Sequence, residues 1–412
     1  MPALFAVTLF ASAALLFLVQ PLVGKMVLPL LGGSPAVWNT CMVFFQAVLL
    51  LGYLYAHKLA SVRDTRRQVW IHLVVIGAGA AALGLAAVFT PTPVPVLSSL
   101  APQGDGFPIL NVLAILAVGV GVPFFVVSTT APLLQKWFVA TGHPSARDPY
   151  FLYAASNAGS LLTLLAYPLA VEPLMRVADQ AWVFAAGFAA LAALVAVCGR
   201  AAANPLRPPS LALAPQPDAS GEVISTRRKL LWLGLAFVPS SLMLGVTTHM
   251  TTDIAAIPLL WVLPLALYLL TFVIAFARGS HTLLGLLSNV TPVAALLLVF
   301  GITSGIELSV FLQVLIHTGV FFLIALTCHT RLAAMRPDAR HLTTFYLWVS
   351  LGGVAGGVFN GLLAPVLFPQ VIEYSAALVA GCLLLPPTRP KDETPGAENR
   401  EGLRLMVDLM VP

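Results

Sequence analysis

The lysines and arginines of this chain lie almost entirely on one side of a repeated hydrophobic pattern. Apolar stretches of about 20 residues recur twelve times, and each is long enough to cross ~30 Å of hydrocarbon as a helix. In order, they cover residues 3–30, 36–56, 69–90, 109–135, 150–171, 180–198, 230–250, 256–277, 282–302, 307–330, 342–364 and 370–386. The pattern predicts an all-α integral membrane protein of about 12 transmembrane helices.

The charge distribution indicates how the spans are oriented across the membrane. If the N-terminus is cytoplasmic, cytoplasmic segments hold 19 of the 21 basic residues, and only Lys25 and Arg176 are exceptions. The 19 are Lys58, Arg63, Arg66, Arg67, Lys136, Arg147, Arg200, Arg207, Arg227, Arg228, Lys229, Arg278, Arg331, Arg336, Arg340, Arg389, Lys391, Arg400 and Arg404. Basic residues favour the cytoplasmic side of membrane proteins, so we expect both termini in the cytoplasm. The net charge of +5 then reflects membrane orientation, and we expect no nucleic-acid partner.

The longest polar interruption divides the spans six and six. It covers residues 199–229 and is rich in Pro, Ala and Ser, which is typical of a linker. We therefore predict an N-terminal six-helix transmembrane half (1–198), a cytoplasmic linker (199–229), a C-terminal six-helix half (230–386) and a cytoplasmic tail (387–412). Short internal sequence similarities favour two parallel repeats. Pro35–Trp38 resembles Pro258–Trp261, and Phe151–Ser156 resembles Phe345–Ser350.

Prolines and polar runs interrupt several spans. They occur at Gln20-Pro21 in the first span, at Pro123 in the fourth, at Pro239 in the seventh and at Pro264 in the eighth. A broken helix in hydrocarbon needs a polar partner for its freed backbone groups. We therefore expect helix breaks at these positions around a water-filled cavity.

Lys25 is the strongest single candidate for a functional residue, because a lysine at the bilayer centre costs about 2.5–3.5 kcal/mol on insertion scales. It either faces a polar cavity or snorkels to the interface near the end of its span. In a cavity, its candidate counter-charges are Asp253, Glu172 and Glu373.

Other polar and aromatic residues in or beside the spans could line a solute path. His249 could relay protons, or it could be a hydrogen-bonded packing residue. Trp38 and Trp261 could equally belong to the interfacial aromatic belt. The full candidate set is Gln20, Lys25, Trp38, Gln46, Ser128, Thr129, Tyr153, Ser156, Asn157, Glu172, His249, Asp253, Trp261, Asn360 and Glu373.

No catalytic, metal or cofactor motif is present in the sequence. It has no HExxH, no Walker Gly-Lys-Ser/Thr and no GxSxG, and its four cysteines lack metal-ligand spacing. The glycines of residues 352–357 lie inside an apolar span, where their spacing predicts close helix packing instead of phosphate binding. We therefore expect no catalytic residues, no metal and no cofactor.

Three segments carry a resemblance to a known family. They are Phe17–Trp38, with Gln46 and Gly52–His57 following, then Asp148–Ser160, and Thr248–Trp261. They resemble the major-facilitator-like membrane part of bacterial fused MFS/spermidine synthase proteins, over about residues 5–386. Such proteins usually continue into a soluble aminopropyltransferase-like domain. This chain stops at Pro412 without one, so the resemblance implies no synthase activity here.

The resemblance implies a multi-pass protein of the bacterial inner membrane, surrounded by the lipid bilayer. The first reading is a transporter that moves a small polar or cationic solute, of polyamine-related chemistry, by alternating access. The alternative is a non-transporting anchor or regulatory module for a separate aminopropyltransferase-like partner. An integral membrane enzyme is a third reading. A water-filled polar cavity favours the first reading, and a dry bundle favours the second.

Overall fold

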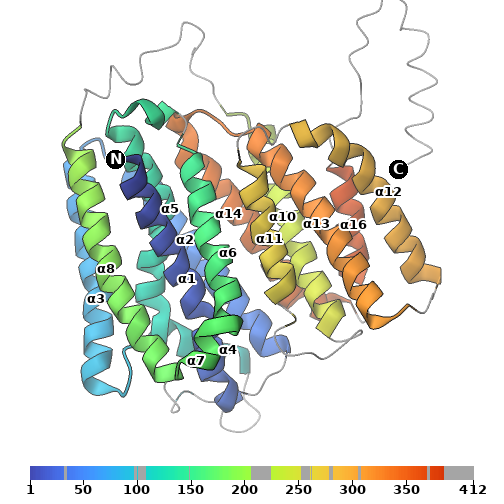
Figure 1. Ribbon diagram of the computed structural model, residues 1–412, viewed down its shortest axis with the longest axis horizontal. Coiled ribbons are helices and arrows are strands. Elements are labelled where there is room, and N and C mark those ends of the chain that lie inside the picture. Colours follow the sequence, from blue (N-terminus) through green and yellow to red (C-terminus); the bar gives the residue numbers. More distant parts are fainter. Residues whose placement is uncertain are drawn as a thin grey trace, which may run out of the picture.

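The computed structural model describes residues 1–31, 35–96, 100, 108–147, 149–205, 224–251, 260, 262–277, 282–304, 308–368 and 372–384. Within these ranges the chain forms a bundle of long helices (Figure 1). Among the described residues, ten helices are long and apolar enough to cross a membrane, and Val262–Ala275 and Glu373–Leu383 form two shorter apolar helices. The structure therefore confirms the all-α membrane fold and its approximate helix number. Most of the predicted linker and the whole predicted tail lie outside the described residues.

The first six spans pack together on the left of Figure 1. Their helices are α1 (Pro2–Leu31), α2 (Pro35–Ala60), α3 (Thr65–Phe89), α4 (Pro108–Leu116), α5 (Val122–Ala140), α6 (Phe151–Ala166), α7 (Glu172–Leu174) and α8 (Val177–Ala203). A wider π-helical turn, η2 (Ala117–Gly121), joins α4 to α5, and a second one, η4 (Tyr167–Val171), joins α6 to α7. A short 3₁₀ turn, η3 (Pro144–Arg147), precedes α6.

The remaining spans pack on the right of the same view. They are α10 (Thr226–His249), α11 (Val262–Ala275), α12 (Leu283–Ser304), α13 (Val310–Ala334), α14 (Leu342–Val358), α15 (Ala364–Leu367) and α16 (Ile372–Leu383). A π-helical turn, η8 (Phe359–Leu363), joins α14 to α15, and a 3₁₀ turn, η7 (Ala339–His341), precedes α14. One hydrophobic core lies among α1–α8, and a second lies mainly among α10–α16. These two cores support our proposal of two six-span halves.

Glycines permit a close helix crossing in each half. A Cβ atom at Gly159 of α6 would lie 2.5 Å from the backbone oxygen of Phe10 in α1. A Cβ atom at Gly356 of α14 would likewise lie 2.5 Å from the backbone oxygen of Phe237 in α10. The packing role predicted for the 352–357 glycines is therefore confirmed at Gly356.

The two halves repeat this arrangement. In each half the fifth span crosses the first span at a glycine, and it then enters a π-helical turn, η4 or η8. A π-helical turn adds one residue to a helical turn, and such turns are rare. Its presence at the same place in α6–α7 and α14–α15 supports the parallel repeat that the sequence echoes indicate.

The predicted helix breaks at Gln20-Pro21 and Pro239 are wrong. Helix α1 continues from Pro2 to Leu31 through Pro21 and Pro29, and α10 continues through Pro239. A proline removes one backbone hydrogen bond, but neighbouring helices can hold the remaining turns in place. The fourth span does change geometry near the predicted position, because η2 ends at Gly121, two residues before Pro123.

Candidate functional site

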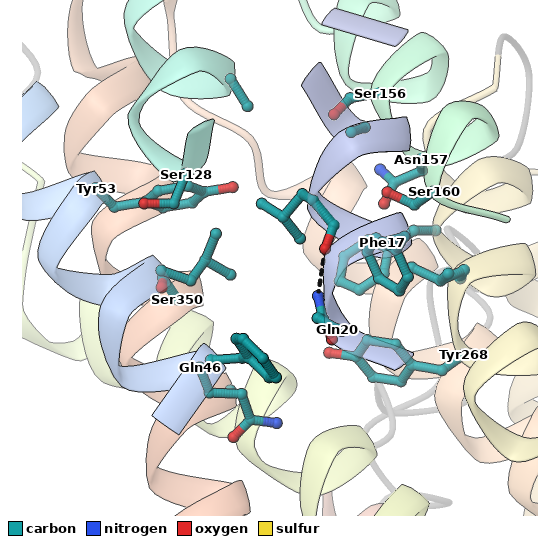
Figure 2. A pocket seen from close by; sticks show the side chains of 18 of the residues that line it. Phe17, Gln20, Gln46, Tyr53, Ser128, Ser156, Asn157, Ser160, Tyr268 and Ser350 are labelled. Atoms are coloured by element: carbon teal, nitrogen blue, oxygen red, sulfur yellow. Dashed lines mark hydrogen bonds between the residues drawn. The ribbon is translucent and has the colours of Figure 1, made fainter. Parts of the chain in front are cut away.

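A cavity of about 190 Å³ lies between the two groups of spans. Helices α1, α2, α5 and α6 line it from one side of the sequence, and α10, α11 and α14 line it from the other. Figure 2 shows Tyr53, Ser128, Gln46 and Ser350 on one wall, with Gln20, Asn157, Ser160 and Tyr268 opposite them. This central cavity has room for several water molecules or one small solute.

The polar lining of the central cavity consists of amides and hydroxyls. Its members are Ser12, Gln20, Gln46, Tyr53, Ser128, Tyr153, Ser156, Asn157, Ser160, Ser240, Tyr268 and Ser350. Among the described residues that line it, none is Asp, Glu, Lys, Arg or His. The remaining lining is apolar and includes several aromatic rings.

Several polar side chains of this lining donate to backbone carbonyls. Gln20 Nε2 donates to the Leu16 carbonyl at 3.1 Å, and Asn157 Nδ2 donates to the Tyr153 carbonyl at 2.9 Å. The Ser128 hydroxyl donates to the Phe125 carbonyl at 2.7 Å, and the Ser240 hydroxyl donates to the Gly353 carbonyl at 2.8 Å. Bonds of this kind leave the side-chain oxygens with acceptor capacity.

Two buried oxygens in the cavity wall lack a hydrogen-bond partner. They are Oε1 of Gln46 and Oγ of Ser350, and the Ser350 side chain is only 8% exposed. Buried polar atoms are usually paired in folded proteins, so each orphan needs an explanation. Both residues contribute to the lining of the central cavity, although these two oxygens are themselves covered by protein.

Aromatic rings from both halves close the cavity toward one end of the bundle. Tyr153 packs 5.0 Å from Tyr346, 4.8 Å from Phe276 and 5.6 Å from Phe272, measured between ring centroids. Tyr53 also approaches Tyr346, with a centroid distance of 6.4 Å. We call this end the basic end, because α1 begins there and the basic residues beside α2, α3, α10 and α14 gather there.

Hydrogen bonds strengthen the closure at the basic end. His57 of α2 and Thr343 of α14 meet at 3.0 Å, between Nδ1 and Oγ1. The Tyr150 hydroxyl donates to the Pro337 carbonyl at 2.8 Å. The Tyr346 hydroxyl donates to Gln135 Oε1 at the same distance. Each of these bonds joins the N-terminal group of spans to the C-terminal group.

Six of the fifteen candidate residues line the central cavity: Gln20, Gln46, Ser128, Tyr153, Ser156 and Asn157. Thr129 is fully buried outside the lining, and its hydroxyl donates to the Val126 carbonyl at 2.7 Å. Asn360 also lies outside the lining and donates to the Ser241 hydroxyl. Asp253, Trp261 and the Trp38 side chain lie outside what the structure describes.

Lys25 pairs with Glu172 and does not line the central cavity. Lys25 Nζ lies 2.5 Å from Glu172 Oε1, and the two side chains are 36% and 26% exposed. Glu172 begins α7 directly after η4, so the π-helical turn fixes where this carboxylate points. The observed counter-charge is one of the three predicted, and the pair lies within the N-terminal group of spans.

We expect Lys25→Met to destabilise the protein by about 1–3 kcal/mol. Breaking a buried pair costs about 3–5 kcal/mol and an exposed pair contributes about 0.2–1 kcal/mol, and this pair lies between the two. The loss arises because Glu172 Oε2 is already buried without a hydrogen-bond partner. Lys25→Met/Glu172→Gln should recover at least half of it, as measured by unfolding in detergent. Strictly additive losses would contradict the pairing.

His249 belongs to a different cluster, formed by α10, α13 and α16, and Glu373 directly precedes Tyr374 of that cluster in the chain. The His249 ring centroid lies 4.6 Å from that of His317 and 5.6 Å from that of Tyr374. His317 Nδ1 and the Tyr374 hydroxyl meet at 2.8 Å. Glu373 is 8% exposed, and its Oε2 has no hydrogen-bond partner. Neither predicted residue lines the central cavity.

Several cavity residues were not predicted from the sequence. They are Ser12, Tyr53, Ser160, Ser240, Tyr268 and Ser350. Helical spacing could have identified one of these residues. An i, i+3, i+4, i+7 pattern relates Tyr153, Ser156, Asn157 and Ser160. That pattern places all four on one face of α6, and extending it from the predicted residues would have found Ser160.

Comparisons with solved structures identify the architecture. The chain is similar to the proton:xylose symporter XylE, with a TM-score of 0.56 and 12% identity over 93% of this chain and 94% of that chain. It is also similar to a bacterial homologue of the iron transporter ferroportin, with a TM-score of 0.57 and 13% identity over 93% and 96%. The fold is of the major-facilitator type.

A third neighbour, a peptide transporter POT in complex with alafosfalin, has a TM-score of 0.54. Its identity is 19%, over 93% of this chain and 92% of that chain. No protein-family model matches the sequence, and a search of curated proteins gave no match. The structural likeness therefore establishes the membrane fold, and the solute has to be argued from the cavity.

Proposed function

We propose that this protein moves a small polar solute across the membrane by alternating access through the central cavity. The observation that carries this proposal is a polar cavity between two groups of spans that are joined by side-chain contacts at the basic end. Opening those contacts while the other end closes would expose the same cavity to the other side. The structural neighbours are transporters for a sugar, iron and peptides, which supports the same mechanism class.

The polar lining of the central cavity distinguishes a transporter from a dry anchoring module. A bundle that only holds a partner protein has no need for amide and hydroxyl side chains around an internal cavity, because polar groups are costly in hydrocarbon. They are useful if water or solute enters the cavity. No feature of the described residues favours an aminopropyltransferase partner, and that partner remains a prediction from the sequence resemblance.

The charges of the described residues do not favour a polyamine. The acidic residues expected to meet a cation lie elsewhere: Glu172 pairs with Lys25, and Glu373 lies on α16 outside the cavity lining. Asp253 is outside the described residues. A polyamine would leave several positive charges in the central cavity without a carboxylate partner.

We further propose that the basic end faces the cytoplasm of a bacterial cell, in accordance with the positive-inside rule. The closure at the basic end would then separate the central cavity from the cytoplasm. Solute would enter the cavity from the outside of the cell. We propose the domain boundaries that the sequence predicts, for the N-terminal half, the linker, the C-terminal half and the tail.

Sided labelling of single cysteines tests the orientation and the cavity together. In a cysteine-free background, an impermeant thiol reagent added to intact cells should modify Ser156→Cys in the cavity wall. It should not modify Ser220→Cys in the proposed linker, which should react only after the cells are opened. Failure of Ser156→Cys to react in intact and opened cells would indicate a dry bundle and overturn the transporter proposal. Labelling of Ser220→Cys in intact cells would reverse the orientation.

A further inference from the structure

The central cavity has a more specific chemistry than polarity alone. We infer that its solute is an uncharged molecule rich in hydrogen-bonding groups, with an apolar face. This inference rests on the proposed transport function and names the substrate class of that same site.

The first argument is charge. No described residue that lines the central cavity carries a formal charge, although its walls come from seven helices. An ionised solute that leaves water for such a site loses its hydration without gaining a counter-charge. The nearest ionic feature on α1 is Lys25, which is already neutralised by Glu172 outside the cavity. A neutral solute avoids this desolvation penalty.

The second argument is the hydrogen-bonding capacity of the wall. The amides of Gln20 and Asn157 each use one N–H on a backbone carbonyl, and the hydroxyls of Ser128 and Ser240 do the same, so their oxygens keep acceptor capacity. The hydroxyls of the three tyrosines in the lining can donate. The wall therefore offers both acceptors and donors without a formal charge, and a solute with several hydroxyl or amide groups satisfies it best.

The third argument is the apolar surface beside these acceptors. Phe17, Phe45, Phe124 and Phe272 line the cavity together with the ring faces and edges of its tyrosines. Aromatic rings favour contact with apolar or C–H-rich faces of a ligand. Rings could also attract a cation, but Tyr153 and Tyr268 already pack against neighbouring rings. The combination therefore selects a neutral molecule with one polar and one apolar side.

Two matched probe series test this inference on the purified full-length protein. The first is glucitol, gluconate and 1-amino-1-deoxyglucitol, which share a carbon chain and differ in one terminal group. The second is tyrosol, 4-hydroxyphenylacetate and tyramine, which add an aromatic face. Spermidine serves as a polyamine probe. Equilibrium binding should show a neutral probe binding at least tenfold more tightly than its charged relatives.

A charge introduced into the wall should change this preference. In Gln20→Glu the side chain keeps its size and gains a carboxylate, so the amine probe of the binding series should gain at least tenfold over its neutral relative. Gln313→Glu is the matched control, because Gln313 lies on α13 outside the central cavity and its side chain bonds only the Leu308 carbonyl in the described structure. The control should keep the neutral preference.

The outcomes separate the two proposals. Preferential binding of a neutral probe, reversed by Gln20→Glu and unchanged by Gln313→Glu, supports both. Preferential binding of spermidine or another charged probe by the unaltered protein overturns the uncharged-solute inference and leaves transport standing. Binding of no probe from any charge class counts against the proposed transport function itself.

Discussion

Joining residue 57 of α2 to residue 343 of α14 should reduce solute uptake at least a hundredfold. His57 and Thr343 meet at 3.0 Å across the closure at the basic end, so His57→Cys/Thr343→Cys places two thiols within reach of a short bifunctional reagent. Alternating access requires this closure to open once in each cycle, and a covalent link would hold one state. Uptake of a labelled neutral probe into proteoliposomes measures the effect.

A link within one half is the matched control for this experiment. Thr8 Oγ1 of α1 and Cys198 Sγ of α8 lie 3.4 Å apart, and both helices belong to the N-terminal group of spans. Thr8→Cys with the native Cys198 therefore gives a crosslink that leaves the two halves free to move. Its uptake should stay within about twofold of the unlinked protein. Undiminished uptake by the fully linked 57–343 protein would mean that this closure does not open during transport.

Replacing Gly356 with valine should prevent the C-terminal spans from assembling. A Cβ atom at this position would lie 2.5 Å from the Phe237 oxygen and 2.9 Å from the Ser241 nitrogen, and both are backbone atoms of α10. Overpacking a well-packed interior typically costs 1–3 kcal/mol, and backbone atoms cannot move aside as a side chain can. We therefore expect a loss of more than about 3 kcal/mol, which is a large part of the 5–15 kcal/mol that stabilises a typical protein.

Gly353 provides the control for that substitution on the same helix. A Cβ atom at Gly353 would meet nothing within 4 Å, so Gly353→Val tests the effect of valine in α14 without the clash. Gly353→Val should yield monodisperse protein with an unfolding midpoint near that of the unaltered chain. Gly356→Val should lose most of the monodisperse yield. Equal behaviour of the two variants would show that α10 and α14 do not approach as closely as described.

The membrane architecture could be predicted from the sequence because its determinants act residue by residue. Burying an ionised Arg or Lys in hydrocarbon is costly wherever it lies, so charge and hydropathy mark span ends without knowledge of the neighbours. The glycines of residues 352–357 likewise predict close packing, because a missing side chain permits close approach in almost any helix pair. These features predicted about twelve spans, of which the described residues show ten long and two shorter apolar helices, and they predicted the packing role of Gly356.

The composition of the cavity wall needed the tertiary structure. A wall built from seven helices depends on how each helix is rotated, and hydropathy along one chain does not contain that rotation. Gln20 and Lys25 illustrate the point, since they lie five residues apart on α1 and only Gln20 lines the cavity. At 3.6 residues per turn, five residues rotate a side chain about 140° around the helix, away from the cavity.

The Lys25–Glu172 pair and the continuity of α1 at Pro21 were also decided in three dimensions. Glu172 follows η4 directly and pairs with Lys25, a residue 147 positions away in the chain, and no local motif predicts that contact. Pro21 leaves α1 unbroken because the packed neighbours of α1 hold its turns, and a proline in isolation carries no information about them. The sequence by itself determined where the chain crosses the membrane, because that depends on the transfer of each side chain into lipid. The tertiary structure alone decided which polar groups meet, because that depends on the rotation and packing of helices far apart in the chain.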